Sequence, residues 1–275
     1  MQSTRSAYAI GGVAALAVLV AAFYLWRRDI ASVPAAVTPP SIELAPPTSA
    51  ASMPEPQVHY PIDTKTAATP SAKAFDLQTA LEDLFGLKTV ESMFRLDDFP
   101  RRLAATIDNL GRSHASATLW PINPASGRFT VEERDGATFI GADNGLRYTP
   151  YVLLLETVDL RQAVSIYARI YPTLQHAYED LGYPKGYLND RLVQVIDLLL
   201  ATPEIDAPIQ VRLPSIEGPL RPQRPWLLYE FVDPNLQSLA SGQKALLRTG
   251  SVNERRIKAR LAEIRRLVTA APKKR

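Results

Sequence analysis

The longest stretch without a charged residue runs from Tyr8 to Trp26, nineteen residues that are almost all apolar. As a helix rising about 1.5 Å per residue it would be about 28 Å long, close to the bilayer hydrocarbon thickness of about 30 Å. Its aromatic end is followed by Arg27 and Arg28, which is typical of a membrane interface and not of a signal-peptide cleavage site. We therefore predict a short leader over residues 1–7 and an uncleaved transmembrane helix over residues 8–26.

The segment that follows, residues 29–73, contains nine prolines set among Ala, Ser, Thr and Val. Proline lacks the amide donor that helices and sheets need, and the segment has too little apolar surface to offset its ordering entropy. We predict a disordered Pro/Ala-rich linker. A tether of this kind after an amino-terminal anchor favours a single-pass protein of the bacterial inner membrane with a periplasmic globular domain. The basic residues beside the anchor do not fix the orientation by themselves.

Several classes of chemistry are excluded by composition and spacing. The chain has no cysteine, which excludes disulfides, thiolate metal sites and a cysteine nucleophile. Its three histidines, at positions 59, 114 and 176, do not have metal-ligand spacing, and no phosphate-binding glycine motif occurs. We therefore predict no metal site, no cofactor and no nucleic-acid partner.

The rest of the chain is long enough for one sizeable core. We predict one globular domain over residues 75–270, of the α+β class and mostly α, followed by a basic tail over residues 271–275. Apolar spacing and caps predict helices over residues 75–85, 98–110, 149–155, 159–181, 187–201 and 251–268. Short strands are predicted over residues 129–133 and 137–140, as a hairpin around Asp135-Gly136, and over residues 209–213 and 226–231.

The last of these helices is amphipathic and basic. Ser251-Val252-Asn253-Glu254 has the pattern of a capping box, and apolar residues then recur at positions 257, 261, 264 and 268. Nine Lys and Arg but one acidic residue lie between Arg255 and Arg275. We favour docking of the apolar stripe on the core, with the arginines paired to an acidic body. The alternative is contact with anionic lipid headgroups or an acidic partner.

Several short motifs carry a family resemblance. They are Thr106–Leu110, Arg147–Tyr151, Ile170–Pro172, Ala177–Pro184, Leu188–Arg191 and Gly242–Arg248. In these motifs the chain resembles the uncharacterised bacterial family called domain of unknown function 3014, over most of residues 75–270. The resemblance implies an amino-terminal membrane span, a proline-rich linker and this domain. It implies no activity and no catalytic or ligand-binding residues.

The densest cluster of polar and aromatic residues gives the candidate binding site. Its members are Tyr167, Tyr171, Tyr178, Tyr183, Tyr187, Asn189, Asp190 and Arg191. Three of the tyrosines share helical spacing and would form a platform on which a carbohydrate or a peptide stacks. The alternative, which we favour, is that the tyrosines pack two helices together while Asp190 and Arg191 satisfy the intervening turn.

Nothing in these patterns specifies a reaction, and we predict no catalytic residues. The leading hypothesis is a non-enzymatic, membrane-tethered envelope domain that binds a protein or cell-wall partner, with lipid contacts through residues 8–26 and a homo-oligomer as a further option. The alternative is a peptidoglycan-active glycosidase. Glu91-Ser92 resembles the Glu-Ser pair of helical lytic transglycosylases, in which the glutamic acid protonates the glycosidic oxygen, although the Gly-Leu-Met-Gln segment of that family is missing.

Overall fold

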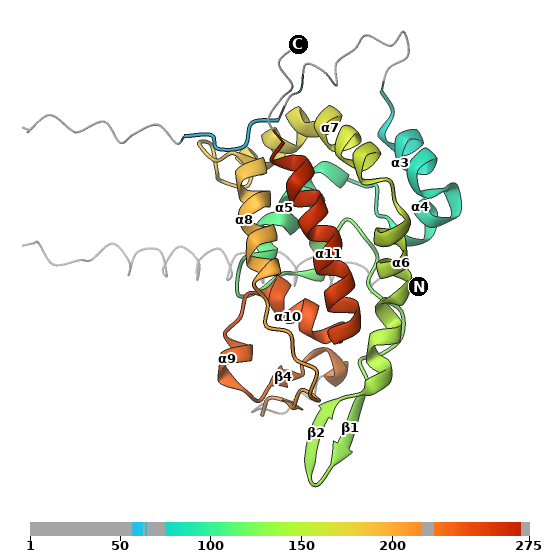
Figure 1. The fold of residues 1–275 in the computed structure, drawn as a ribbon, viewed down its shortest axis with the longest axis vertical. Coiled ribbons are helices and arrows are strands. Elements are labelled where there is room, and N and C mark those ends of the chain that lie inside the picture. The colour runs from blue at the N-terminus through green and yellow to red at the C-terminus, as the bar shows by residue number, and fades with distance from the viewer. Residues whose placement is uncertain (1–56, 63, 65–74, 216–222, 271–275) are drawn as a thin grey trace, which may run out of the picture. The chain divides into compact units, whose positions relative to one another are not determined.

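The computed structural model describes residues 57–62, 64, 75–215 and 223–270 (Figure 1). They belong to one compact unit, Pro54–Arg275. The predicted membrane helix over residues 8–26, the predicted basic tail and most of the predicted linker lie outside the described residues. Within the described part of the chain, no helix is both long and apolar enough to cross a bilayer.

The domain is mostly helical, as predicted (Figure 1). The predicted helices are present within a few residues of the expected bounds, as α3 (Leu77–Phe85), α5 (Phe99–Leu110), α6 (Thr149–Thr157), α7 (Leu160–Asp180), α8 (Leu188–Leu200) and α11 (Ser251–Val268). Asp159 caps α7 as expected, because its carboxylate accepts the amide protons of Arg161 at 2.8 Å and Gln162 at 3.2 Å. Local signals were therefore sufficient for the long helices.

Shorter elements were not predicted from the sequence. They are the helices α4 (Leu87–Met93), α9 (Pro234–Gln237) and α10 (Ser241–Arg248), and the 3-10 turns η1 (Ala117–Leu119), η2 (Ala142–Tyr148) and η3 (Pro225–Leu227). Each has too few turns for an apolar periodicity to stand out from chance. η3 also replaces the first half of the strand that was predicted over residues 226–231.

The strands form two short antiparallel pairs. β1 (Val131–Arg134) pairs with β2 (Ala137–Ile140), and Asp135 and Gly136 between them have φ of 49° and 75°, the left-handed conformation that a two-residue hairpin turn requires. β3 (Val211–Arg212) pairs with β4 (Glu230–Phe231). The amide of Ile140 donates to the Ile209 carbonyl at 3.0 Å, which joins the hairpin to the segment before β3.

Three apolar clusters hold these elements together. The largest lies between α3, α5, α7 and the start of α8, where Ala104, Leu174 and Leu188 are fully buried. A second contains Val195 and Leu199 of α8 and Leu246 of α10, and Ile257 and Leu261 of α11 pack against it. The third covers the β3–β4 pair through Val211, Phe231 and Leu247. α5, α8 and α10 each contribute to two of the three clusters and so connect them.

The start of α11 corrects the predicted capping box. The N-cap is Gly250, with φ of 84°, and Ser251 is the first helical residue. Glu254 does not reach back to the cap, since it is 1 % exposed and pairs with Lys258 at 3.1 Å. The chain enters the helix where the glycine allows a left-handed bend, and this bend moves the helix start one residue away from the Ser-x-x-Glu pattern.

The rest of α11 follows the favoured interpretation of its sequence. Ile257 and Leu261 pack on the second cluster, and Val268 is buried. Its basic side chains pair with acidic residues elsewhere in the domain. The pairs are Arg255–Asp206, Arg256–Glu156, Lys258–Glu204 and Arg265–Asp197. The apolar stripe and much of the charge of this helix thus serve the fold.

Candidate functional site

The five predicted tyrosines lie together where α7 packs on the start of α8. Tyr171 and Tyr178 are buried, at 4 % and 5 % exposure, and the other three are partly buried in the largest cluster. Tyr171 contacts the rings of Tyr167 and Tyr187 at centroid distances of 5.5 and 5.4 Å, and Tyr178 stacks on Tyr183 at 4.6 Å. This arrangement is the packing alternative: the rings join two helices and do not form an exposed platform.

Hydroxyl and amide groups of α7 satisfy the first amides of α8. The Tyr171 hydroxyl accepts the amide proton of Asn189 at 3.1 Å, and Oε1 of Gln175 accepts that of Leu188 at 2.9 Å. Such amides have no partner within their own helix. Burial raises the pKa of Tyr167 and of Tyr171 well above the usual range, so both phenols stay protonated and donate, Tyr167 to Oδ1 of Asn189 at 3.3 Å.

Three polar side chains at the start of α8 hold a distant segment of the chain. Both oxygens of Asp190 accept backbone protons, from His59 at 2.9 Å and from Tyr60 at 2.8 Å. The Tyr187 hydroxyl accepts the amide proton of Ile62 at 2.8 Å, and Nδ2 of Asn189 donates to the Tyr60 carbonyl at 2.8 Å. We call Tyr187, Asn189 and Asp190 the α8 clasp, and residues 57–62 the strap.

The strap belongs to the segment that was predicted as a disordered linker over residues 29–73. The hydrogen bonds of the strap hold it against the domain, beside the start of α8 and the end of α11 (Figure 1). Asn189 is fully buried and also donates to the Val268 carbonyl, at 3.1 Å. One side chain therefore links the strap, α8 and the end of α11.

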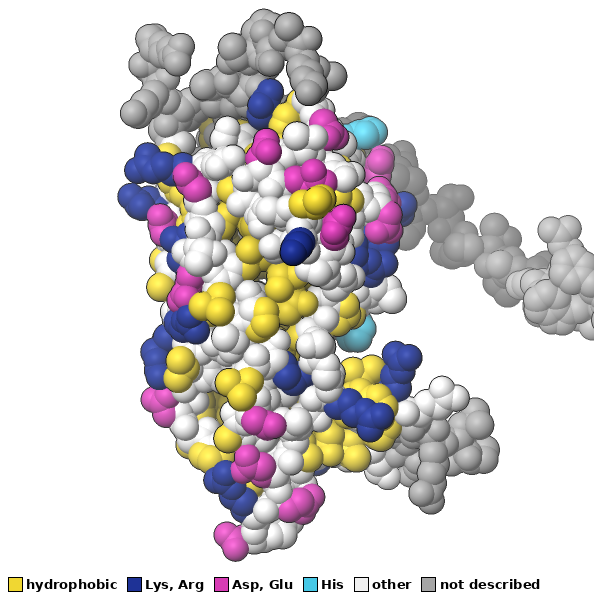
Figure 2. All heavy atoms as spheres, turned by 90° about the vertical axis from the view of Figure 1, so that its right-hand side faces the viewer, with side chains coloured by type: hydrophobic (Ala, Val, Ile, Leu, Met, Phe, Trp, Pro, Cys, Tyr) yellow, Lys and Arg dark blue, Asp and Glu magenta, His cyan; other side chains and the backbone are white. Residues whose placement is uncertain are grey.

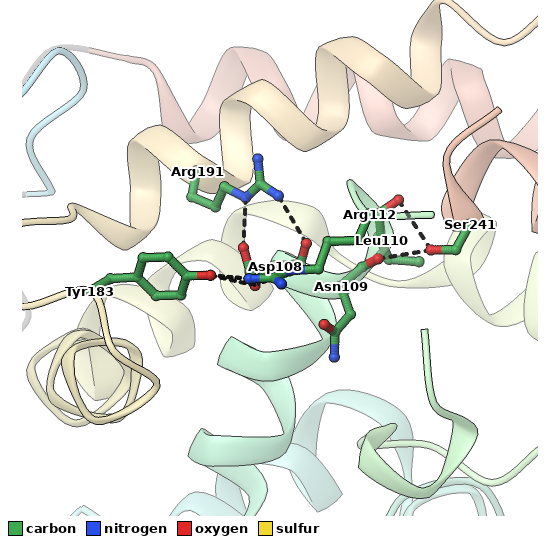
Figure 3. Close-up of polar contacts among 7 residues, drawn as sticks. All are labelled: Asp108, Asn109, Leu110, Arg112, Tyr183, Arg191 and Ser241. Atoms are coloured by element: carbon green, nitrogen blue, oxygen red, sulfur yellow. Dashed lines mark hydrogen bonds and ion pairs between the residues drawn. The ribbon is translucent and has the colours of Figure 1, made fainter. Parts of the chain in front are cut away.

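The eighth predicted residue, Arg191, faces a buried carboxylate instead of the strap (Figure 3). Asp108 of α5 is 6 % exposed and accepts from Nε of Arg191 at 3.1 Å, from Nε of Arg112 at 2.8 Å and from the Tyr183 hydroxyl at 3.1 Å. Nη2 of Arg191 also donates to the Asp108 carbonyl at 2.9 Å. Asp108 and Tyr183 raise the pKa of Arg112. This network fixes α8 against α5.

Ser241 of α10 contacts the end of α5 beside the Asp108 network (Figure 3). Its hydroxyl donates to the Asn109 carbonyl at 2.8 Å, at the end of α5. A β-carbon at Gly111 would come within 2.7 Å of Nη2 of Arg191, and one at Gly242 within 3.0 Å of the Leu110 carbonyl oxygen. Two glycines thus allow α5, α8 and α10 to approach closely. The sequence signal that could have found Asp108 is its i,i+4 relation to Arg112, which lies just beyond the end of α5.

A pocket of about 580 Å³ lies elsewhere in the domain, between β2, η2, the segment before β3 and the α10–α11 junction. Its lining is largely apolar, and two of the apolar side chains that line it reach far into solvent: Leu146 is 71 % exposed and Val252 is 64 % exposed. Figure 2 shows that apolar side chains also reach the surface between charged ones on one face of the domain. An exposed apolar surface beside a concave site is typical of a binding region. The pocket was not predicted from the sequence.

Three carboxyl groups in and around the pocket have a lowered pKa, which favours their ionised form. A hydrogen bond from Ser251, followed by Arg255, lowers the pKa of Asp206. Arg256 lowers the pKa of Glu156, and the amide of Ala142 lowers that of Glu132. A general acid needs the opposite shift, a raised pKa that keeps the proton available near neutral pH. These three carboxyls do not have that shift, whereas burial raises the pKa of Glu254, which lies next to Asn253 of the pocket lining and pairs with Lys258 at 3.1 Å.

Glu91, the candidate general acid of the glycosidase alternative, is exposed on α4. It does not line the pocket, and the hydroxyl of its neighbour Ser92 donates to the Lys88 carbonyl at 2.7 Å within the helix. A glycosidase acid acts from a cleft that surrounds the scissile bond. Among the residues that the structure describes, no group of three or more His, Asp or Glu side chains is arranged to hold a metal ion.

The fold and these sites define a mostly helical α+β domain with a strap-holding clasp at one end of α8 and an apolar pocket beside the start of α11. The chain belongs to the family described as Protein of unknown function (DUF3014), which it matches over residues 99–265. This confirms the resemblance found in the sequence motifs. No curated protein and no solved structure gives a significant match to the chain.

Proposed function

We propose that the chain is a non-enzymatic, single-pass protein of the bacterial inner membrane whose periplasmic domain binds a protein partner through the pocket beside α11. The apolar stretch over residues 8–26 and the proline-rich segment after it support the membrane tether. The observation that carries the binding role is the exposure of Leu146 and Val252 where they line the pocket. Burial of such side chains by a partner is favourable, at about 25 cal/mol per Å².

The composition of the pocket favours a protein partner over the cell wall. Sugar rings are usually bound against flat aromatic side chains with hydroxyl partners. None of the described residues that line the pocket is aromatic, whereas Ile140, Ile209 and Leu146 are aliphatic. Such a lining suits an apolar side chain projected by a protein. The glycosidase alternative gains no support, because Glu91 is exposed and lies outside this pocket.

A photo-crosslinking residue, benzoylphenylalanine, tests the pocket in living cells when it replaces Leu146. We expect a discrete protein adduct from position 146. Position 227 is the matched control, because Leu227 is 67 % exposed and does not line the pocket. We expect at least about ten-fold less adduct there. Adding Val252→Asp should reduce the adduct at position 146 by about ten-fold, because a carboxylate in an apolar interface costs at least about 1.4 kcal/mol.

The same experiment separates the alternatives. Adducts with peptidoglycan fragments at position 146 would assign the pocket to the cell wall. Equal adduct formation at positions 146 and 227, or an adduct that Val252→Asp leaves unchanged, would contradict a role for the pocket in binding.

A further inference from the structure

We propose that the α8 clasp is a peptide-binding site, and that its ligand in this structure is the chain's own strap, residues 57–62. This site is separate from the pocket beside α11, so the inference does not depend on the function proposed above. The ligand class is an extended peptide with two consecutive free amides, then a proline, then an aliphatic residue.

The contacts of the clasp are directed at the backbone of the strap. Asp190 uses both oxygens on the amides of His59 and Tyr60, Tyr187 accepts from Ile62, and Asn189 donates to the Tyr60 carbonyl. Peptide-recognition sites obtain affinity in this way, from main-chain hydrogen bonds to an extended segment. Pro61 has no amide proton, so the one position of this run that lacks a donor needs no partner.

The side chains of the strap alternate as in an extended peptide. Tyr60 and Ile62 are partly buried, and Ile62 packs against the largest apolar cluster. His59 and Pro61 are exposed. Residues i and i+2 of an extended chain face the same side, so Tyr60 and Ile62 supply the side-chain recognition. The most selective position is Ile62, which enters apolar surroundings.

The clasp is held in place by the domain itself. Asn189 is fully buried, its amide donates to Tyr171, and its side chain also donates to Val268. Arg191, which follows Asp190 on α8, is fixed by Asp108. By contrast, the carboxylate of Asp190 has hydrogen bonds only from the strap among the residues that the structure describes. The site is therefore preorganised, and among the described residues the Asp190 carboxylate is bonded to the strap alone.

The covalent connection explains how a short segment stays bound. Residues 63–74 join the strap to the start of α3, and a connection of this length gives a local concentration of the order of millimolar. A weak intrinsic affinity is then enough.

The test uses the full-length protein and a fluorescein-labelled peptide of residues 57–62, with binding followed by anisotropy. Ile62→Asp places a charge against the apolar cluster and should empty the clasp without altering α8. Val58→Asp is the matched control, because Val58 is 45 % exposed and its side chain faces solvent. We expect the peptide to bind Ile62→Asp at least about ten-fold more tightly than the wild type or Val58→Asp. We also expect Asp190→Ala, added to Ile62→Asp, to remove at least about ten-fold of that affinity.

Each result decides the proposal. Equal binding to the wild type and to Ile62→Asp, no binding to Ile62→Asp at millimolar peptide, or binding that Asp190→Ala leaves unchanged would overturn it. Faster amide exchange of residues 59, 60 and 62 in Ile62→Asp, with unchanged exchange in α7, confirms that only the strap is released. Light scattering shows whether the strap in the clasp comes from the same chain or from a second copy. Dimers that dissociate in Ile62→Asp would mean that the strap binds the clasp of a second copy, which would overturn docking within one chain.

Discussion

Replacing Asp108 with alanine is expected to lower the free energy of unfolding by about 3 kcal/mol, the low end of the cost of breaking a buried ion pair. The side chain of Asp108 is 8 % exposed, and that of Arg191 is 25 % exposed. Removing the carboxylate leaves Nε of Arg191 and the Tyr183 hydroxyl without their buried acceptor, while Nη2 of Arg191 keeps the backbone carbonyl of residue 108. Arg112 adds less to the loss, since its side chain is 51 % exposed and is solvated after the change.

Urea denaturation of the purified protein measures this loss. The matched control is Asp180→Ala, because the Asp180 side chain is 65 % exposed and pairs only loosely, with His176 at 3.8 Å. We expect a change below about 1 kcal/mol for this control. Equal losses for the two variants would mean that the Asp108 network does not hold α5 against α8.

Replacing Leu174 with alanine is expected to cost about 3–5 kcal/mol. Leu174 is fully buried in the largest apolar cluster, between α5, α7 and the start of α8. Its truncation removes packed apolar atoms and leaves a cavity beneath the tyrosines that carry the clasp. The same denaturation experiment applies.

Leu153→Ala provides the control for Leu174→Ala, because Leu153 is 48 % exposed on α6 and loses the same atoms. We expect a loss below about 1 kcal/mol there. A loss of that small size for Leu174→Ala would show that the α7 face is not the centre of the fold.

Elements with strong local signals were predictable from the sequence. α7 has an Asp159 cap and apolar residues at helical spacing, and the β1–β2 hairpin has Asp135-Gly136, whose positive φ values match the turn type. These signals depend on neighbours within a few residues. For the same reason the capping box of α11 was misplaced, because the left-handed Gly250 shifts the helix start and the Ser-x-x-Glu pattern does not reveal this.

The residues of the candidate site could be predicted from the sequence, but the distant residues that they bind could not. The cluster around Tyr171 and Asn189 stands out in composition, and the structure brings its residues together. The strap that Asp190 holds lies 131 positions away at His59, and Arg191 meets Asp108 across 83 positions. No periodicity carries such a pairing. The pocket beside α11 was also missed, since its lining comes from segments that are adjacent only in the fold.

Labelling of a single cysteine in intact cells tests the central proposal, a membrane-tethered domain in the periplasm, most directly. The chain has no cysteine, and Ser165 is exposed on α7, so Ser165→Cys introduces one accessible thiol with little change in shape. A membrane-impermeant maleimide should label this thiol in intact cells as fully as in permeabilised cells. Labelling only after permeabilisation would place the domain in the cytoplasm and contradict the account.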